Sequence, residues 1–451
     1  MTEESKSSLA LAVRLFLDEG PRALWNRALD RREEKIRLRR LPRLREDHGR
    51  LSGAIGSPPV LNVSSLPPSP KRGGAQIQML DRLAEEKKLR TVALAYPRDG
   101  FWWLEVSGPT VAGIVAIGDE GTTADLVQRA ANLVGTSVVH IESLAGLPLD
   151  LIGELEDRKL TTVLSIHDFT LFCRRPHLIE TSTTEFCGYC QDSDRCDECL
   201  RDLDLDPFPT QEAYRRAGAE ALRSASTVIY PSKFLQRQYR VLFPDHRGQT
   251  RENVIAPASS RSTSSKCKAT RRMRVGFVGG AYTHKGGALI APTIERVRTQ
   301  LPDAGAFVYG NGERVHFRRL RNSLGIRVRG YYRPGMLASL LLRDQISIAV
   351  FPSIWPEAYA LVVDECLSVG VPVVAFDHGA VADRLRAWKV GDLVPLRESA
   401  SGLAESVVSC LASDLGVPDT VISDLPLPES SAKQHVDLYR SLIALAGRSD
   451  R

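Results

Sequence analysis

The sequence has 451 residues, which is too long for one ordinary domain and allows two domains with an appendage. Apolar residues make up 43% and charged residues 25%, as in globular proteins, so a disordered or low-complexity chain is excluded. The net charge of +6 is small for this length and does not indicate nucleic-acid binding. The basic leader also lacks the interleaved aromatic residues that such binding uses.

The first 57 residues predict a basic helical leader followed by a linker. Residues 1–50 carry 13 basic and nine acidic side chains, so they hold four of the six excess positive charges. Arg-rich helices with an apolar face can dock on an anionic membrane surface, and a solvated charged helix is the alternative. The sequence contains neither an apolar run of about 18 residues nor the core of a signal peptide. We therefore expect a cytoplasmic protein, with peripheral docking on the inner membrane face as a hypothesis for residues 1–50.

Strands and helices alternate along the rest of the chain, which predicts two tandem doubly wound, Rossmann-like α/β domains. We place the N-terminal domain at 58–258, a linker at 259–272 and the C-terminal domain at 273–430. A helix within 431–451 should return to the N-terminal domain. Such sheets bind ligands beyond the carboxyl ends of their strands, so we expect the site in a cleft between the domains. The predicted strands are 60–63, 91–96, 111–117, 137–141, 162–166, 227–230, 274–278, 306–309, 327–331, 346–351 and 371–375, and the predicted helices are 75–88, 123–133, 149–158, 288–301, 315–324, 361–369 and 432–445.

Two glutamates in the C-terminal half are eight positions apart, at the junction of a strand, a loop and a helix. We expect Glu357 at the start of the helix and Glu365 a little over two turns later, so that both can face one cleft. The backbone amides of 358–361 would then be unpaired donors at a helix N-terminus, which is a site for phosphate or sugar oxygens. An ordinary helix with an acidic first turn is the alternative interpretation of the bare pair.

This region resembles the retaining glycosyltransferases of family 4, which have the two-domain GT-B fold. Their signature is E-x7-E, preceded by a Pro-Ser segment and followed by an Ala-Gly-x-Pro-Val-Val strand. The present sequence has these parts in the same order, and the resemblance extends from about Val60 to Tyr439. The matching residues are Phe351-Pro352-Ser353, Glu357, Glu365 and Gly370-Val371-Pro372-Val373-Val374.

The resemblance implies a role for each of these acidic residues and for a glycine loop. Glu357 would contact hydroxyls of the donor sugar, and Glu365 would accept hydrogen bonds from the ribose diol of the nucleotide. Lys285 would stabilise the leaving diphosphate and is the principal catalytic candidate, and no catalytic metal is expected. The remaining candidates for binding the nucleotide sugar in this half are Gly279, Gly280, Gly286, Ala358, Tyr359, Ala360 and Leu361.

Two positions depart from the pattern of the family. Gly280 stands where a second diphosphate-binding Arg is common, so Arg72, His284 or helix amides would have to compensate. Ala358-Tyr359-Ala360 replaces the usual Pro-Phe-Gly, which places a methyl group where a backbone approach is normally open. These replacements would be expected to give a slow or narrowly specific enzyme.

Two features of the N-terminal half also match the family. Gly73-Gly74 corresponds to its N-terminal glycine loop, which lies near the diphosphate and the acceptor. His167, in a His-Asp pair after a predicted strand, would lie beside the donor sugar and is the third catalytic candidate; a structural histidine is the alternative. His140 occupies a similar strand end and ranks second to His167.

Five of the eight cysteines lie between Cys173 and Cys199. Cys187 and Cys190 form one C-x2-C pair and Cys196 and Cys199 form another, five residues later. Two such pairs are the usual source of four thiolates for zinc, so a structural zinc site is predicted, with Cys173 as an additional candidate ligand. Free thiols and an iron–sulfur cluster are the alternatives.

These observations predict a retaining hexosyltransferase. It would move a sugar from a nucleoside-diphosphate sugar to a glycan or lipid-linked acceptor, in the biosynthesis of a surface polysaccharide. The competing interpretation is a degenerate transferase fold that serves as a zinc-stapled binding scaffold, which Gly280, Ala358 and Ala360 favour.

Overall fold

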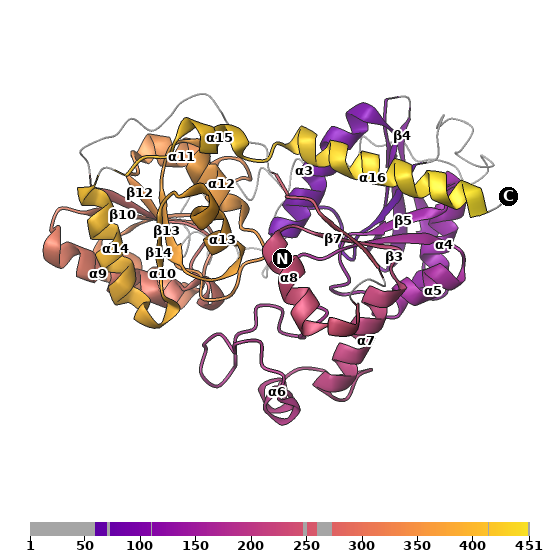
Figure 1. Ribbon diagram of the computed structural model, residues 1–451, viewed down its shortest axis with the longest axis horizontal. Coiled ribbons are helices and arrows are strands. Elements are labelled where there is room, and N and C mark those ends of the chain that lie inside the picture. The colour runs from indigo at the N-terminus through magenta and orange to yellow at the C-terminus, as the bar shows by residue number, and fades with distance from the viewer. Residues whose placement is uncertain are drawn as a thin grey trace, which may run out of the picture. The chain divides into compact units, whose positions relative to one another are not determined.

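The computed structural model describes residues 59–69, 73–109, 111–246, 250–258, 273–413 and 415–449, and these form two compact α/β units (Figure 1). The segment from Pro426 onward belongs to the N-terminal unit. The predicted leader, the 259–272 linker and Arg72 lie outside the described residues.

The N-terminal unit is built on an eight-stranded sheet in the order β4-β3-β2-β1-β5-β6-β7-β8. The neighbours from β2 through β1 to β8 are parallel, whereas β3 is antiparallel to both β2 and β4. The strands are β1 (Leu61–Val63), β2 (Val92–Arg98), β3 (Phe101–Ser107), β4 (Ala112–Gly118), β5 (Val138–Ile141), β6 (Thr161–Ser165), β7 (Thr227–Tyr230) and β8 (Arg251–Val254).

The β2–β3 hairpin is a departure from the predicted alternation of strands and helices. Its turn contains Asp99 and Gly100, both with positive φ (53° and 81°), which is the geometry that Asp-Gly favours in two-residue hairpins. The turn brings the alternating segment Phe101–Ser107 back against β2. The Asp-Gly pair was the available sequence signal for this missed strand.

Helices of the N-terminal unit begin and end at recognisable capping residues. The side chain of Thr122 caps α4 by accepting from the amide of Asp125 at 3.2 Å, and the helix stops at Gly135 in the left-handed conformation. The helices of this unit are α3 (Gly74–Leu89), α4 (Thr123–Val134), α5 (Leu151–Asp157), α6 (Ser193–Cys199), α7 (Gln211–Ser224), α8 (Lys233–Leu242) and α16 (Pro428–Ser449).

The C-terminal unit has a six-stranded, entirely parallel sheet in the order β11-β10-β9-β12-β13-β14, which confirms the predicted doubly wound domain. Helices α9, α10 and α14 contribute to one apolar core and α11, α12, α13 and α15 to another, so both faces of the sheet are covered. The elements are β9 (Arg274–Phe277), α9 (Gly287–Gln300), β10 (Gly305–Tyr309), α10 (Arg314–Leu324), β11 (Arg327–Gly330), α11 (Leu337–Asp344), β12 (Ile348–Phe351), α12 (Leu361–Ser368), β13 (Val373–Phe376), α13 (Gly379–Trp388), β14 (Asp392–Val394), α14 (Ser399–Ala412) and α15 (Asp419–Asp424).

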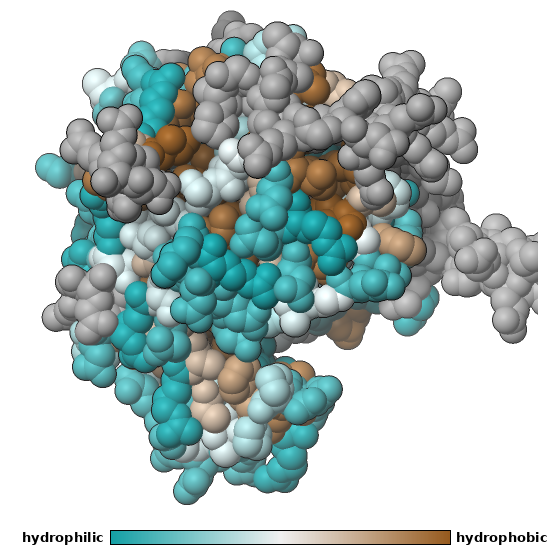
Figure 2. Space-filling model, turned by 90° about the vertical axis from the view of Figure 1, so that its right-hand side faces the viewer, coloured by the Kyte–Doolittle hydropathy of each residue, from teal (hydrophilic) through white to brown (hydrophobic). Residues whose placement is uncertain are grey.

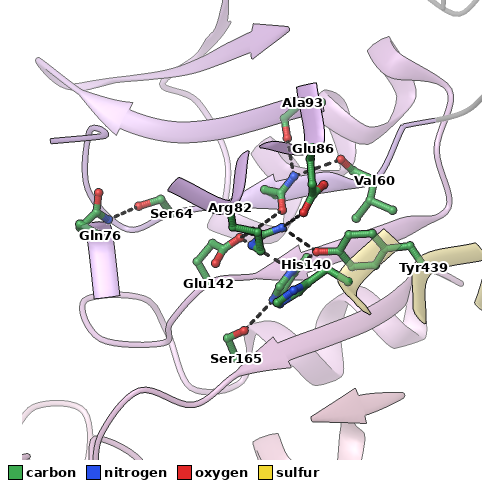
Figure 3. Close-up of polar contacts among 12 residues, drawn as sticks. Val60, Ser64, Gln76, Arg82, Glu86, Ala93, His140, Glu142, Ser165 and Tyr439 are labelled. Atoms are coloured by element: carbon green, nitrogen blue, oxygen red, sulfur yellow. Dashed lines mark hydrogen bonds and ion pairs between the residues drawn. The ribbon is translucent and has the colours of Figure 1, made fainter. Parts of the chain in front are cut away.

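A buried polar cluster ties α16 to the N-terminal sheet (Figure 3). Arg82 of α3 is 3% exposed; its guanidinium forms ion pairs with Glu86 and Glu142 and donates to the Asn62 side chain at 3.1 Å. The same guanidinium donates to the hydroxyl of Tyr439 at 2.9 Å. Because these charges are buried, each depends on the others for compensation.

Replacement of Arg82 by Leu should therefore lower the free energy of unfolding by about 3–5 kcal/mol, because two buried carboxylates lose their cation. Urea denaturation of the full chain measures this loss. The control is Arg440→Leu, which removes an exposed ion pair with Asp437 and should cost less than about 1 kcal/mol. Equal losses in the two variants would contradict the cluster's role.

Candidate active site

The glycine-rich loop after β9 carries Lys285 at the carboxyl edge of the C-terminal sheet. A short 3-10 turn, Thr283–Lys285, ends at Gly286 in the left-handed conformation, and α9 follows at once. A Cβ on Gly286 would lie 1.9 Å from the carbonyl oxygen of Pro352, in the loop after β12. Glycine at this position therefore lets two loops of the sheet edge approach closely.

Gly280 is required by the packing of the same loop. Its φ is +91°, and an added Cβ would lie 2.3 Å from the carbonyl oxygen of Asn311. An arginine would not fit in this backbone, which explains the departure from the family pattern. Of the residues suggested as compensating cations, His284 lies in the loop and stacks on Tyr282, with ring centroids 5.8 Å apart.

Lys285 and Glu357 are brought together directly. The ammonium forms an ion pair with Oε1 of Glu357, whose side chain is 7% exposed. The same oxygen accepts hydrogen bonds from Ser353 at 3.0 Å and from the indole of Trp355 at 2.6 Å. Lys285 also lies over the ring of Trp355, 5.1 Å from its centroid. One oxygen of the carboxylate is thus held by three partners, which orients the group. Sequence reasoning assigned no such role to Ser353 or Trp355, although both flank Glu357 in the motif.

The helix predicted at 361–369 is present, but the expectation that Glu357 stands at its start was wrong. Helix α12 begins at Leu361, so Glu357 and residues 358–360 lie in the preceding loop, and amides 358–360 are not in the first turn of the helix. The Tyr359 hydroxyl donates to Asp364 at 2.9 Å, and Arg384 donates to the Tyr359 carbonyl at 2.8 Å. The guanidinium of Arg384 also lies 4.0 Å from the centre of the tyrosine ring. These contacts hold the loop in its own conformation instead of extending the helix.

Glu365 is buried in different surroundings. Its Oε2 accepts a hydrogen bond of 3.1 Å from the amide of Leu337, the first residue of α11, which is a favourable position for a carboxylate. The residue is 4% exposed. Lys285 and Glu357 therefore form one group, and Glu365 lies in the same domain with a separate partner.

His378 is a candidate that the sequence reasoning missed. It follows β13 directly, and its Nε2 lies 3.2 Å from the carbonyl of Ser353. Burial lowers the pKa of the imidazole and nearby Glu357 opposes that shift. Its Nδ1 has no hydrogen-bond partner among the described residues, so a neutral imidazole leaves an acceptor beside Glu357. A histidine after a predicted parallel strand was the available signal.

The predicted residues of the N-terminal unit lie after β6 and at the start of α3. His167 follows β6 and lines a small pocket with Ser143, Asp168 and Tyr239, and burial lowers its pKa to about 4. Gly73 caps α3 with a φ of +97°, and Gly74 begins the helix; both are exposed. The cleft expected between the two domains stays a prediction.

His140, considered as an alternative to His167, is a structural residue. It is fully buried; its Nδ1 lies 2.6 Å from the Tyr439 hydroxyl and its Nε2 lies 2.8 Å from Ser165 Oγ (Figure 3). Its ring stacks on His435 of α16 at 6.0 Å. Burial and the positive charge of Arg82 lower the pKa of both histidines well below 6.5.

The five clustered cysteines line one pocket of the N-terminal unit. No group of three or more His, Cys, Asp and Glu side chains in the described ranges is already arranged as a metal site, so the predicted zinc stays a prediction.

The two buried histidines should make stability depend on pH. Because the folded state prefers them neutral, the unfolded chain binds more protons below pH 6.5, and the free energy of unfolding should fall as the pH drops from 6.5. Urea denaturation between pH 5 and 8 tests this. His435→Gln should flatten the profile, whereas the control His316→Gln should not. Burial raises the pKa of Glu142 to about 7, and its protonation opposes this trend over the same range, so the comparison of variants is decisive. A stability difference between wild type and His435→Gln that stays constant from pH 6.5 to 5 would refute the prediction.

Ala360 has a left-handed backbone, with φ 69° and ψ 83°, which costs a non-glycine residue about 1 kcal/mol or more. We expect Ala360→Gly to raise the free energy of unfolding by about 0.5–1 kcal/mol. Ala358→Gly, in the same loop but without positive φ, should lower it by a similar amount. Thermal and urea unfolding measure the stability of the two variants. Changes of the same sign in their free energies of unfolding would contradict backbone strain at Ala360.

Comparison with known proteins places the C-terminal domain in a family. Residues 272–413 match the family described as "Glycosyl transferases group 1". The chain is 27% identical over 131 residues to the phosphatidyl-myo-inositol mannosyltransferase of Mycobacterium leprae, which is 29% of this chain and 35% of that protein. The Mycobacterium tuberculosis H37Rv protein of the same name gives 27% over 136 residues with the same coverage. The match thus spans about a third of these relatives.

Solved structures show the fold over about 85% of the chain. Sucrose-phosphate synthase from Thermosynechococcus elongatus aligns with a TM-score of 0.59 at 17% identity, covering 86% of this chain and 100% of that one. HepE of Anabaena in complex with UDP aligns at 0.56 and 15%, covering 85% and 100%. The catalytic domain of starch synthase IV from Arabidopsis thaliana, bound to ADP and acarbose, aligns at 0.54 and 12%, covering 85% and 99%. Residues 272–413 therefore form a domain of the group 1 glycosyltransferase type, in a chain that has the two-domain GT-B fold.

Proposed function

We propose that the protein is a retaining glycosyltransferase that uses a nucleoside-diphosphate sugar. The observation that carries this proposal is the Lys285–Glu357 ion pair at the carboxyl edge of the matched domain, where open α/β sheets bind their ligands. HepE of Anabaena was solved with UDP-glucose, which supports a donor of this class.

The arrangement can perform the charge-stabilising part of the reaction. An ammonium has three donors, so Lys285 can keep Glu357 as one partner and turn the others to phosphate oxygens of the donor. Glu357 retains its bonds from Ser353 and Trp355, and its second oxygen can accept from a sugar hydroxyl. Glu365 would accept from the ribose diol, and His378 and the glycine loop would complete the donor subsite.

In the proposed reaction, the bond between the anomeric carbon and the leaving phosphate oxygen breaks. A bond to the acceptor oxygen forms on the same face of the sugar, and the acceptor proton passes to the leaving phosphate. Lys285 stabilises the developing negative charge of the diphosphate, as preorganised charges do in water-excluded sites. His167 would orient the acceptor, because a neutral imidazole can donate and accept hydrogen bonds.

The acceptor is proposed to be a glycan or a lipid-linked sugar of a surface polysaccharide. Similarity to phosphatidyl-myo-inositol mannosyltransferases supports an acceptor with a lipid part. No helix among the described residues is long and apolar enough to span a membrane. Docking through residues 1–50, which lie outside those residues, stays a prediction.

The alternative of a catalytically inactive scaffold loses two of its supporting features. Gly280 is demanded by contact with Asn311, and Ala360 keeps the left-handed backbone that glycine would adopt. Both departures are therefore compatible with an intact donor loop.

A thermal-shift screen of nucleotides and nucleotide sugars should identify a donor, because a ligand that binds only the folded state raises the melting temperature. Turnover of that donor should fall on the order of 10²-fold or more in Lys285→Ala, since one preorganised charge is removed. Arg296→Ala, which removes an exposed cation of α9, is the control and should leave turnover unchanged. If the wild-type protein neither binds nor hydrolyses any common donor, the scaffold interpretation is favoured instead.

A further inference from the structure

The segment between β6 and α7 has little regular structure to stabilise it. All residues from 166 to 210 are described, and they contain one helix of seven residues, α6, and no strand. Figure 2 shows this lobe at the lower end of the molecule, with hydrophilic residues along its margins and apolar residues gathered between them. Small lobes with so little core usually need a disulfide or a metal ion.

The first cysteine pair has the backbone of a metal-binding turn. Between Cys187 and Cys190, both Gly188 and Tyr189 have positive φ, 68° and 60°. The chain thus reverses tightly between the two cysteines, as it does in metal-binding C-x2-C turns.

The second pair is presented by α6 to the same pocket. Cys196 and Cys199 are three residues apart on the helix and therefore share one face. The Cys196 sulfur lies 3.5 Å from the Cys190 carbonyl, which joins the two pairs. Cys173 lies in the wall of this pocket and its sulfur accepts from the Arg175 amide at 3.4 Å.

Two arginines place positive charge beside the thiols. Arg215 of α7 donates to the Cys190 carbonyl at 2.8 Å and to the Cys196 sulfur at 3.3 Å. Arg175 donates to the Cys199 carbonyl at 3.4 Å. A tetrathiolate zinc centre carries two excess negative charges, so neighbouring cations of this kind lower its electrostatic cost.

We propose that Cys187, Cys190, Cys196 and Cys199 bind one structural zinc ion. The four sulfurs line a common pocket but do not yet have the mutual arrangement of a metal site, so binding includes their convergence by side-chain rotation. Four thiolates from two C-x2-C pairs suit tetrahedral zinc, and cysteines that line one pocket without forming a disulfide remain available as ligands.

The turn between Cys187 and Cys190 also supports the loop that follows β6 and carries His167, an inference that rests on the proposed function. Tyr189, inside the first pair, lies edge-on against Phe169 at 5.4 Å. Phe169 is two residues after His167, and the Tyr239 hydroxyl holds the carbonyl of Asp168 between them at 2.8 Å. Zinc at the turn would therefore fix the position of His167 through Tyr189 and Phe169.

Elemental analysis of the full-length protein, purified under reducing conditions, should find about one zinc per chain. Cys190→Ser and Cys196→Ser should each lose it, whereas the control Cys410→Ser, at a buried thiol of the C-terminal domain, should keep it. In case these variants fail to fold, cobalt replacement in the wild-type protein provides a second test, through the thiolate-to-cobalt absorption of a tetrathiolate site. Iron in place of zinc, no metal after zinc is added back, or zinc retained in both variants would overturn the assignment.

Removal of the zinc with a chelator then tests whether the turn positions His167. Transfer to an acceptor should fall on the order of 10²-fold, because His167 is displaced, while the thermal shift produced by the donor nucleotide is unchanged. Re-addition of zinc should restore transfer. Unchanged transfer by the zinc-free protein would overturn the proposal that zinc positions His167. Metal content and cobalt absorption require no activity, so failure of the proposed function can be told apart from failure of the zinc site.

Discussion

The buried carboxylate of Glu357 is the group on which the candidate site depends. A charged carboxylate inside a protein is costly unless ion pairs and hydrogen bonds replace water, and here Lys285, Ser353 and Trp355 all bond to one of its oxygens. These partners come from the loops after β9 and β12. Satisfying one charge therefore fixes two loops relative to each other, before any ligand arrives. The close approach of Gly286 to the second loop makes that arrangement sterically possible.

The same interaction orients the lysine. Contact with the carboxylate and attraction by the nearby indole ring together hold the ammonium in one position. A diphosphate would then meet a cation whose position is already determined, so little reorganisation is needed at the moment of charge development. The loop that contains Tyr359 is clamped by Arg384 and Asp364 for the same purpose.

The part of the site that could be predicted from sequence is the part encoded locally. Glu357 and Lys285 belong to short motifs at the ends of buried strands, and parallel strands place such ends at one edge. Features decided by distant contacts escaped prediction. The loop conformation of Glu357 and residues 358–360 depends on Arg384, and the roles of His140 and Arg82 depend on Tyr439. The missed β3 is different, because its Asp-Gly turn was visible in the sequence.

The link between α3 and α16 has a consequence for biosynthesis. Arg82 and Tyr439 are 357 positions apart, and residues of β5, β6 and β7 share an apolar cluster with α16. On a ribosome, the first sheet would emerge on the order of tens of seconds before the helix that completes it. Throughout this interval its core stays uncovered and its buried arginine lacks one partner. The N-terminal unit is thus begun before the C-terminal unit but completed after it, which makes it a natural client for chaperones that shield nascent chains.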